Sequence, residues 1–202
     1  MRVLVTGSEG FLGKHICAAL KNRGHEVIGL DSAPGAEIVA DITKVMPIMK
    51  VDAVVHLAAV ASPNVCTANP ELAFSVNVLG TQQVLRLALE SGARKFVFSS
   101  SAHVFDIPAL YLPTDEVSPL RLNNIYTTSK ILGEQLCELY WTNHGLSYTT
   151  LRLFNAYGSG QQRGYLIPDL IAKAENGKIE LQGSNVTKDW VYVEDVANAF
   201  VK

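Results

Sequence analysis

Residues 6–13 read TGSEGFLG and follow directly on the apolar run Arg2–Thr6. Their glycines stand three residues apart, at Gly7, Gly10 and Gly13, where a strand would turn into a helix. Gly7 permits a tight turn, Gly10 lets backbone approach a pyrophosphate, and Gly13 lets the helix pack close to the sheet. Because free N–H groups at a helix start attract anions, this stretch predicts a dinucleotide phosphate loop. The alternative is a glycine-rich strand-to-helix turn that binds no ligand.

Apolar strand patterns and helical patterns alternate outward from this loop. The predicted strands are Arg2–Thr6, Glu26–Leu30, Ala53–Leu57, Lys95–Ser99 and Ser147–Leu153, with a weaker one at Ile38–Ala40. These short runs show little alternation, as strands covered on both faces do. We predict an α/β fold, a Rossmann-type doubly wound parallel sheet with helices on both faces.

The predicted helices carry start and stop signals. They span Phe11–Arg23, Pro70–Glu90 and Asn124–Asn143, and each is followed by a glycine. Asn69 is the expected N-cap of the second helix. Beyond Asn155 the pattern is less regular. It predicts a helix near Ile167–Asn176, strands at Ile179–Leu181 and Asp189–Val193, and a helix from Glu194 that has no capping signal by Lys202.

Composition argues against several classes of protein. The 202 residues are 48% hydrophobic, enough for one sizeable core and short for two full domains. The 17 basic and 19 acidic residues form no long run of one sign, which argues against nucleic acid and membrane partners. Cys17, Cys66 and Cys137 lack metal-type spacing, so we expect reduced thiols in a cytoplasmic protein and no metal site. No stretch approaches the roughly 18 apolar residues of a membrane span, and Met1 runs directly into a predicted strand, so we expect a soluble protein without a signal peptide.

Asp31 closes the second predicted strand, about 20 residues beyond the glycines, where a carboxylate can accept hydrogen bonds from ribose hydroxyls. No arginine follows it. A 2′-phosphate would meet repulsion there, so the sequence favours NAD over NADP. Asp41 and Ile42 are predicted to lie near the adenine. The alternative for Asp31 is a turn aspartate ahead of Pro34.

Tyr126 and Lys130 are four residues apart on the predicted helix Asn124–Asn143, so they share one helix face. Such a pair also arises by chance, and the spacing alone proves little. A free phenol has a pKa of about 10, and a nearby ammonium together with an oxidised nicotinamide would favour the phenolate. We therefore expect a lowered pKa and a general base at Tyr126.

Three serines, Ser99 to Ser101, end a predicted buried strand. Open α/β sheets place their ligands at the carboxyl edge of the strands. Ser101 is therefore our candidate for the hydroxyl that hydrogen-bonds the reacting oxygen. The alternative is that the serines only end a strand and begin a loop.

Seven blocks in order make the chain resemble the extended short-chain dehydrogenase/reductase family, in its NAD-dependent sugar epimerase/dehydratase branch. The blocks are Thr6–Gly13, His56–Ala59, Asn77 ahead of Gly80-Thr81, Ser99–Ser101, Tyr126–Lys130, Arg152–Gly158, and Lys188–Trp190 ahead of Val193–Asp195. The resemblance implies cofactor contacts in addition to those already argued. These are Phe11 and Leu12 through backbone N–H groups, Leu57, Ala58, Ala59, Asn77, Ser99, Tyr126 and Lys130.

The resemblance also implies substrate contacts. Ser101 and Tyr126 would bracket the sugar hydroxyl, while Asn155 and Lys188 would contact the diphosphate. Lys188 replaces a common arginine, which keeps the charge and loses the bidentate fork. His56 is expected to pack at a strand end without a catalytic role.

Two departures from the family pattern bear on the reaction. Ala102 and His103 stand where 4,6-dehydratases have acidic side chains, which favours epimerisation or carbonyl reduction over dehydration. The usual Val-Tyr-Gly is Val104-Phe105-Asp106, so the local substrate contact is left open.

We therefore predict a nucleotide-sugar epimerase that acts at C4 of a UDP-hexose through a 4-keto intermediate, with transient hydride transfer to NAD. The alternatives are an NAD-dependent dehydrogenase, reductase or dehydratase on a nucleotide sugar or small alcohol, and a non-catalytic dinucleotide-binding protein. Residues 1–154 are the expected NAD-binding domain, and 155–202 a partial, C-terminally truncated substrate segment. The family also implies a homodimer formed by helices Pro70–Glu90 and Asn124–Asn143.

Overall fold

The central feature is a six-stranded parallel sheet with the order β3-β2-β1-β4-β5-β6. The computed structural model describes residues 1–105, 109–175, 177, 179, 185 and 187–202. The strands are β1 (Arg2–Thr6), β2 (Glu26–Asp31), β3 (Ile38–Val39), β4 (Ala53–His56), β5 (Lys95–Ser101) and β6 (Ser147–Leu153). Strand order reverses between β1 and β4, and such a switch point opens a crevice at the carboxyl edge of the sheet.

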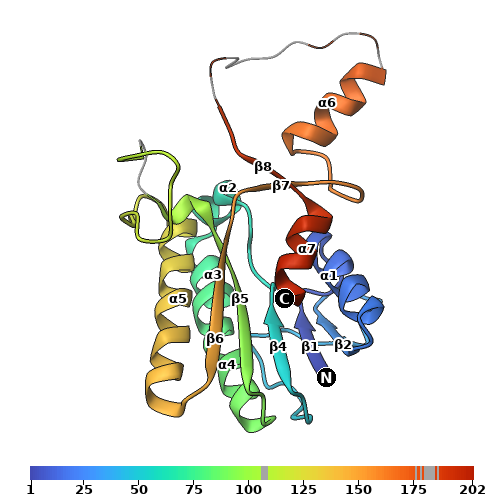
Figure 1. Ribbon diagram of the computed structural model, residues 1–202, viewed down its shortest axis with the longest axis vertical. Coiled ribbons are helices and arrows are strands. Elements are labelled where there is room, and N and C mark those ends of the chain that lie inside the picture. Colours follow the sequence, from blue (N-terminus) through green and yellow to red (C-terminus); the bar gives the residue numbers. More distant parts are fainter. Residues whose placement is uncertain (106–108, 176, 178, 180–184, 186) are drawn as a thin grey trace.

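Helices cover both faces of this sheet, as predicted (Figure 1). On one face lie α3 (Pro70–Phe74), α4 (Thr81–Glu90) and α5 (Ile125–His144), and on the other lie α1 (Phe11–Asn22) and α7 (Val193–Val201). The remaining elements are α2 (Pro63–Ala68), η1 (Ser75–Gly80), η2 (Ala102–Val104), β7 (Asn155–Tyr157), α6 (Leu166–Glu175) and β8 (Trp190–Tyr192).

Two apolar cores form because successive strand residues point to opposite faces. Leu4 belongs to the cluster that contains Phe96 and Leu85, whereas its neighbour Val5 packs with Ile16 on the other face. All of these side chains are fully buried. Burial of each contributes roughly 1.5–3 kcal/mol, so the two layers hold the strand ends in fixed positions.

Helix α5 is capped at both ends, and it ends at Gly145 as predicted. The Asn124 side chain accepts the N–H of Thr127 at 2.9 Å, which is an N-cap hydrogen bond. Gly145 ends the helix in the left-handed region, with φ of 71°, and donates its N–H to Trp141 O at 2.8 Å. The helix therefore starts and stops one residue later than predicted.

The predicted helix Pro70–Glu90 is correct in extent and interrupted in its middle. Segment η1 is a π-helical stretch between α3 and α4, a feature that often marks functional sites. Asn69 stands at the N-cap position, yet its side chain does not cap α3 and instead donates to Val65 O at 3.5 Å. The short helix α2, which Ser62 caps, was not predicted.

Residues beyond 154 do not all lie apart from the main sheet. Strands β7 and β8 form a separate parallel pair, and Figure 1 shows them with α6 beyond the carboxyl ends of the main strands. Helix α7 instead packs against α1, with Phe200 in the second core cluster. The division after residue 154 stays a prediction. The predicted strand Ile179–Leu181, like Asn176 and Asp106, falls at least partly outside the described residues.

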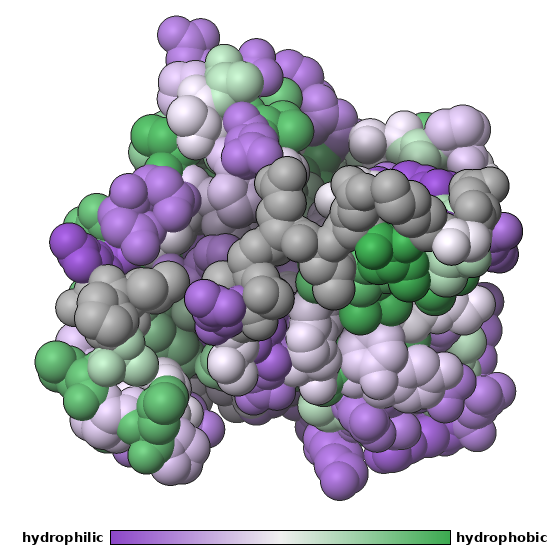
Figure 2. Space-filling model, turned by 90° about the horizontal axis from the view of Figure 1, so that it is seen from above, coloured by the Kyte–Doolittle hydropathy of each residue, from purple (hydrophilic) through white to green (hydrophobic). Residues whose placement is uncertain are grey.

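The surface mixes polar and apolar groups. From the α6 end, Figure 2 shows hydrophobic residues in several separate groups among hydrophilic ones. The three cysteines are free thiols, as expected. Over the described ranges, no helix combines the length and apolar character needed to cross a membrane.

Gly13 provides a test of how closely α1 approaches the end of β1. A Cβ atom there would lie 2.1 Å from Gly7 O and 2.8 Å from Ser8 backbone atoms, which cannot move cheaply. Gly13→Ala is therefore predicted to lower the free energy of unfolding by about 1–3 kcal/mol or more. Gly10→Ala, whose added methyl meets Gly7 O at 3.3 Å, should cost less. Equal urea midpoints for the two variants would contradict this packing.

Candidate active site

A cleft of about 1360 Å³ opens at the carboxyl edge of the sheet. Loops after β1, β2, β4, β5 and β6 line it, and α5 contributes Tyr126 and Lys130. The cleft brings together every predicted site residue except Asn77. They are Gly7, Gly10, Phe11, Leu12, Gly13, Asp31, Asp41, Ile42, Leu57, Ala58, Ala59, Ser99, Ser101, Tyr126, Lys130, Asn155 and Lys188.

The glycine loop forms a cradle that contains no side chain at its closest point. Gly7 adopts a φ of 73°, and an added Cβ would lie 2.8 Å from the backbone nitrogen of Ala58. Gly10 occupies the N-cap of α1 without a side-chain cap, so no side chain competes for the N–H groups of the first turn. A phosphate group can therefore approach the backbone here.

Asp31 is held by the loop that it faces. Its two carboxylate oxygens accept the N–H groups of Glu9 at 2.9 Å and Ala33 at 3.0 Å. Each carboxylate oxygen can accept a further hydrogen bond, so two ribose hydroxyls could be bound. Glu9 also lines the cleft, which the sequence reasoning missed. Two carboxylates at this end disfavour a 2′-phosphate and favour NAD.

Asp41 and Ile42 lie at the same end of the cleft. Asp41 accepts the backbone N–H and the hydroxyl of Thr43, both at 2.8 Å, and these bonds lower the pKa of its carboxyl. Ile42 fills the space beside Gly80, where a Cβ would lie 2.7 Å from its Cδ1. Ile42 thus provides an apolar floor, while Asp41 remains exposed to donors from a ligand.

Lys130 is a buried ammonium at the centre of the cleft. Its Nζ donates to Ser99 O at 2.8 Å and lies 5.2 Å from the centroid of the Phe98 ring. Burial lowers its pKa to about 8, while the nearby Cys66 and Glu134 act in the opposite direction. Lys130 is therefore mainly cationic at neutral pH and loses its proton under mildly alkaline conditions.

Tyr126 is 8% exposed, and burial raises the pKa of its phenol, with the Ser101 side chain opposing the rise. The lowered pKa that we predicted counted both Lys130 and an oxidised nicotinamide, and in the protein alone the pKa is raised. The ammonium points to the Ser99 carbonyl, 6.0 Å from the phenol ring centroid, and desolvation is the largest effect on the phenol. A cationic ligand beside the phenol would be needed to lower the pKa.

The three serines at the end of β5 have different partners. Ser101 lies beside Tyr126 in the cleft, and its hydroxyl accepts the N–H of His103 at 3.2 Å. Ser100 donates to Glu134, and Ser99 holds Lys130 through its carbonyl. Of the three, Ser101 is the serine whose side chain interacts with the Tyr126 phenol.

His103 occupies the cleft next to Tyr126, with the two ring centroids 6.2 Å apart in an edge-on arrangement. Burial, and to a smaller extent Lys188, lowers the pKa of its imidazole. His103 is therefore neutral at pH 7. Asn155 donates to Asp189 O at 2.8 Å, which ties the strand β7 to the segment that carries Lys188. These residues form the outer wall of the cleft.

Asn77 and His56 lie beneath the cleft rather than in it. The Asn77 carboxamide accepts the N–H of Val60 at 2.7 Å and donates to Val60 O and to Ser129 Oγ, at 3.1 and 2.9 Å. Its polar atoms therefore hold the loop after β4, and Asn77 does not line the cleft; its contact with the cofactor stays a prediction. His56 is 1% exposed and does not line the cleft.

An ion pair behind the cleft has no local sequence signal. Arg152 donates to Glu134 through Nε at 3.1 Å and through Nη2 at 2.8 Å, and its Nη1 donates to Glu116 O. Glu134 follows Lys130 by one helical turn. The pair fixes β6 against α5 and ties the loop around Glu116 to the same place.

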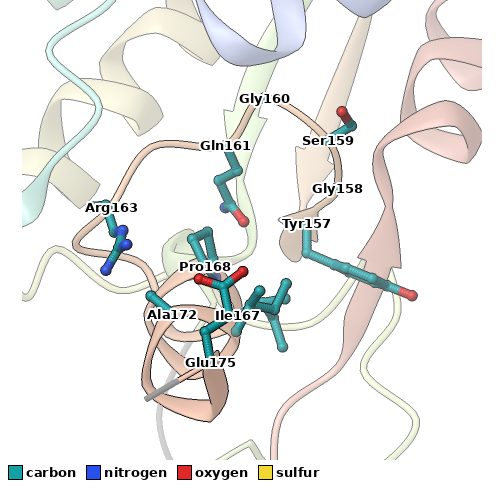
Figure 3. Close-up of a pocket in the computed structure, with 11 residues that line it drawn as sticks. Tyr157, Gly158, Ser159, Gly160, Gln161, Arg163, Ile167, Pro168, Ala172 and Glu175 are labelled. Atoms are coloured by element: carbon teal, nitrogen blue, oxygen red, sulfur yellow. The ribbon is translucent and has the colours of Figure 1, made fainter.

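A second cavity of about 460 Å³ lies between the loop 157–161 and α6. Figure 3 shows the Gln161 side chain pointing toward Pro168 and Ile167 of this helix. Gln161 donates to Ala156 O at 2.9 Å and also lines the main cleft. None of the predicted catalytic residues lines this second cavity.

Comparison with known proteins agrees with this geometry. A sequence model of the NAD dependent epimerase/dehydratase family matches residues 3–202. A putative UDP-glucose 4-epimerase from Methanocaldococcus jannaschii is 33% identical, over 98% of this chain and 71% of its own. UDP-glucuronic acid decarboxylase 6 from Arabidopsis thaliana is 30% identical, over 100% of this chain and 65% of its own. The structure of Thermus thermophilus UDP-glucose 4-epimerase in complex with NAD superposes with a TM-score of 0.83 at 30% identity, covering 99% of this chain and 73% of that one.

Burial of Lys130 predicts a stability cost. Its folded pKa of about 8 lies below the ordinary 10.5, so the cost is fully present below pH 8 and disappears as the pH rises toward 10.5. We expect Lys130→Met to raise the free energy of unfolding at pH 7 by about 1–3 kcal/mol, a value that already allows for the lost hydrogen bond to the Ser99 carbonyl. The gain should shrink between pH 8 and 10.5 in urea titrations. Exposed Lys21→Met is the control, and a destabilised Lys130→Met would contradict the prediction.

Proposed function

Because the chain belongs to the NAD-dependent epimerase/dehydratase family, we propose that it is a nucleotide-sugar epimerase that inverts C4 of a UDP-hexose. The observation that carries the proposal is the convergence of Ser101, Tyr126 and Lys130 in one cleft with the glycine cradle. Its relatives include decarboxylases, so the choice of reaction rests on the side chains of this chain.

The cleft residues fit NAD in three respects. Gly7 lets the glycine loop lie against the backbone of Ala58, where no Cβ would fit, the Asp31 oxygens are held by backbone N–H groups, and Ala58 presents a small side chain. When bound, NAD supplies a hydride acceptor beside the sugar carbon. Lys130 would hold the ribose of the nicotinamide, and Phe11 and Leu12 would direct backbone N–H groups at the pyrophosphate.

The proton chemistry belongs to Tyr126. Its Oη accepts the proton of the sugar hydroxyl as the carbon is oxidised. It returns the proton to the same oxygen after the keto sugar has rotated to present its other face. The Ser101 hydroxyl holds the same substrate oxygen and fixes its distance from the phenol. Lys130, cationic at neutral pH, favours the phenolate that forms. Asn155 and Lys188 are placed to contact the diphosphate.

A second candidate is dehydration of the same class of substrate, and His103 is the observation that favours it. A neutral imidazole beside Tyr126 can carry a proton to or from a neighbouring carbon or leaving hydroxyl. Ala102 offers no such group at the adjacent position. One imidazole in place of two acidic groups gives this candidate less support than epimerisation.

Supplying UDP-glucose or UDP-galactose to the protein and analysing the products separates these possibilities. The epimerase produces the other isomer without net consumption of NAD. Accumulation of NADH would indicate a dehydrogenase, and a product lighter by one water would indicate a dehydratase. No conversion of any UDP-sugar by protein that binds NAD would overturn the proposal.

Tyr126→Phe tests the assignment of the base. Loss of the hydroxyl should lower turnover by roughly 10²–10⁴-fold, because the phenol oxygen is the proposed acceptor of the substrate proton, while NAD binding stays nearly unchanged. Tyr148→Phe, on β6 and outside the cleft, is the matched control. Turnover and calorimetric NAD affinity would be measured together. Near-normal turnover of Tyr126→Phe would assign the proton transfer elsewhere.

The predicted homodimer is retained as part of this proposal. Leu79 on η1 and Leu139 on α5 are 56% and 50% exposed, on helical segments that pack together. Pairing of two such faces would bury both side chains in a four-helix bundle. Light scattering should give twice the mass of the chain, and a monomer at all concentrations would contradict the dimer.

A further inference from the structure

One continuous chain of hydrogen bonds runs beneath the cleft, from the loop after β4 to helix α5. Its side chains are at most 2% exposed. In order, they belong to Thr6, His56, Thr81, Asn77 and Ser129. None of them lines the cleft, so they touch the bound ligands only through other residues.

The first half joins the ends of two central strands. Thr6 and His56 are the last residues of β1 and β4 and are register partners, so their side chains lie on the same face. Thr6 Oγ1 is 2.7 Å from His56 Nδ1. Thr6 Oγ1 also accepts the N–H of Ala58, at 3.4 Å, which brings the cleft loop into the chain.

The second half sets the direction of every bond. Thr81 Oγ1 donates its one hydrogen to Asn77 O at 2.7 Å, so at His56 Nε2, 3.0 Å away, it can only accept. His56 must therefore carry its proton on Nε2, and its Nδ1 must accept from Thr6. The opposite tautomer would leave the Thr6 hydroxyl without an acceptor among the described residues.

From Asn77 the chain continues to the catalytic helix. Asn77 belongs to the π-helical segment η1, and its Nδ2 donates to Ser129 Oγ at 2.9 Å. Ser129 in turn donates to Tyr126 O at 2.7 Å. The same Asn77 carboxamide holds both backbone groups of Val60. One residue thus fixes the loop after β4 and the helix that carries the phenol.

The environment keeps the His56 ring neutral. The ring contacts those of Phe96 and Phe98, and the Lys130 ammonium lies 5.2 Å from the centroid of the Phe98 ring. Burial, with a smaller effect of Lys130, lowers the pKa of His56 to about 3. The ring is therefore neutral at physiological pH, and loss of any buried partner leaves a polar group unsatisfied.

We propose that Thr6, His56 and Thr81 are positioning residues that align the Ala58–Val60 backbone with the helix of Tyr126. They would set the wall against which NAD binds, and they require the Nε2–H tautomer of His56. The effect on NAD affinity follows from the geometry of the loop. The effect on turnover rests on the proposed function, because it acts through Tyr126.

The tautomer can be measured directly by ¹⁵N NMR of the histidine-labelled protein. We expect His56 to show a protonated Nε2 and an unprotonated Nδ1, with no titration between pH 5.5 and 8, because its pKa of about 3 lies below that range. An Nδ1–H tautomer or a titrating ring would overturn the assignment. This measurement needs neither substrate nor a variant.

Substitutions at Thr81 separate the hydroxyl from simple packing. Thr81→Val keeps the shape, removes the hydroxyl and should raise the Kd for NAD roughly three- to tenfold. Thr81→Ser keeps the hydroxyl, loses the methyl and should bind NAD with nearly wild-type affinity. Thr150→Val is the matched control, because the buried Thr150 Oγ1 has no partner in the described part of the chain. Weaker NAD binding by Thr81→Ser than by Thr81→Val would overturn the proposal.

Turnover at saturating NAD tests whether the hydrogen-bond chain also positions Tyr126. Turnover should fall in Thr81→Val even when NAD is saturating, and it should stay close to the wild-type value in Thr81→Ser. If wild-type protein binds NAD and converts no UDP-sugar, the proposed function fails. The NMR and NAD-affinity results still test whether Thr6, His56 and Thr81 act as positioning residues. If Thr81→Val does not fold, Thr81→Ser and the His56 tautomer remain as tests. A Thr81→Ser variant that folds well but binds NAD poorly would overturn the proposal.

Discussion

The burial of one ammonium group, that of Lys130, is the constraint on which the cleft depends. An isolated charge in an apolar interior is costly, and here the Ser99 carbonyl and the Phe98 ring compensate part of that cost. This arrangement needs the Ser99 carbonyl, which lies past the last residue of β5 that pairs with β4, to accept from the ammonium, and it needs α5 to pack directly on the strand. Gly133 permits that packing, since a Cβ there would lie 2.5 Å from the Phe98 ring. The same contact that completes the core therefore places a titratable cation beside the phenol.

Much of the site was predictable because its signals are local. The glycine spacing in residues 6–13 requires a tight turn and a close helix, and both are found. Tyr126 and Lys130 share a face because helix geometry leaves them no other arrangement, and the Asn124 cap fixes where that helix begins. Short apolar strands separated by helices admit few topologies, so the parallel sheet followed from the pattern.

The rest depends on contacts between distant residues. The π-helical turn η1 leaves no trace in the apolar periodicity, and it carries Asn77, whose side chain accepts the N–H of Val60. Glu134 and Arg152 are 18 residues apart and meet only after β6 has docked beside β5. Burial raises the pKa of Tyr126 in the protein alone, and neither this burial nor the orientation of the Lys130 ammonium could be predicted from the sequence.

We propose that the buried phenol of Tyr126 and the ammonium of Lys130 face the nicotinamide end of NAD, whose pyrophosphate lies on the glycine loop. A crystal structure of the protein with NAD bound would show this directly. We expect the pyrophosphate over Gly7–Gly13, the adenosine ribose on Asp31, and the nicotinamide ribose within hydrogen-bonding distance of Tyr126 Oη and Lys130 Nζ. A nicotinamide ring that lies away from Tyr126, or a dinucleotide bound outside this cleft, would contradict it.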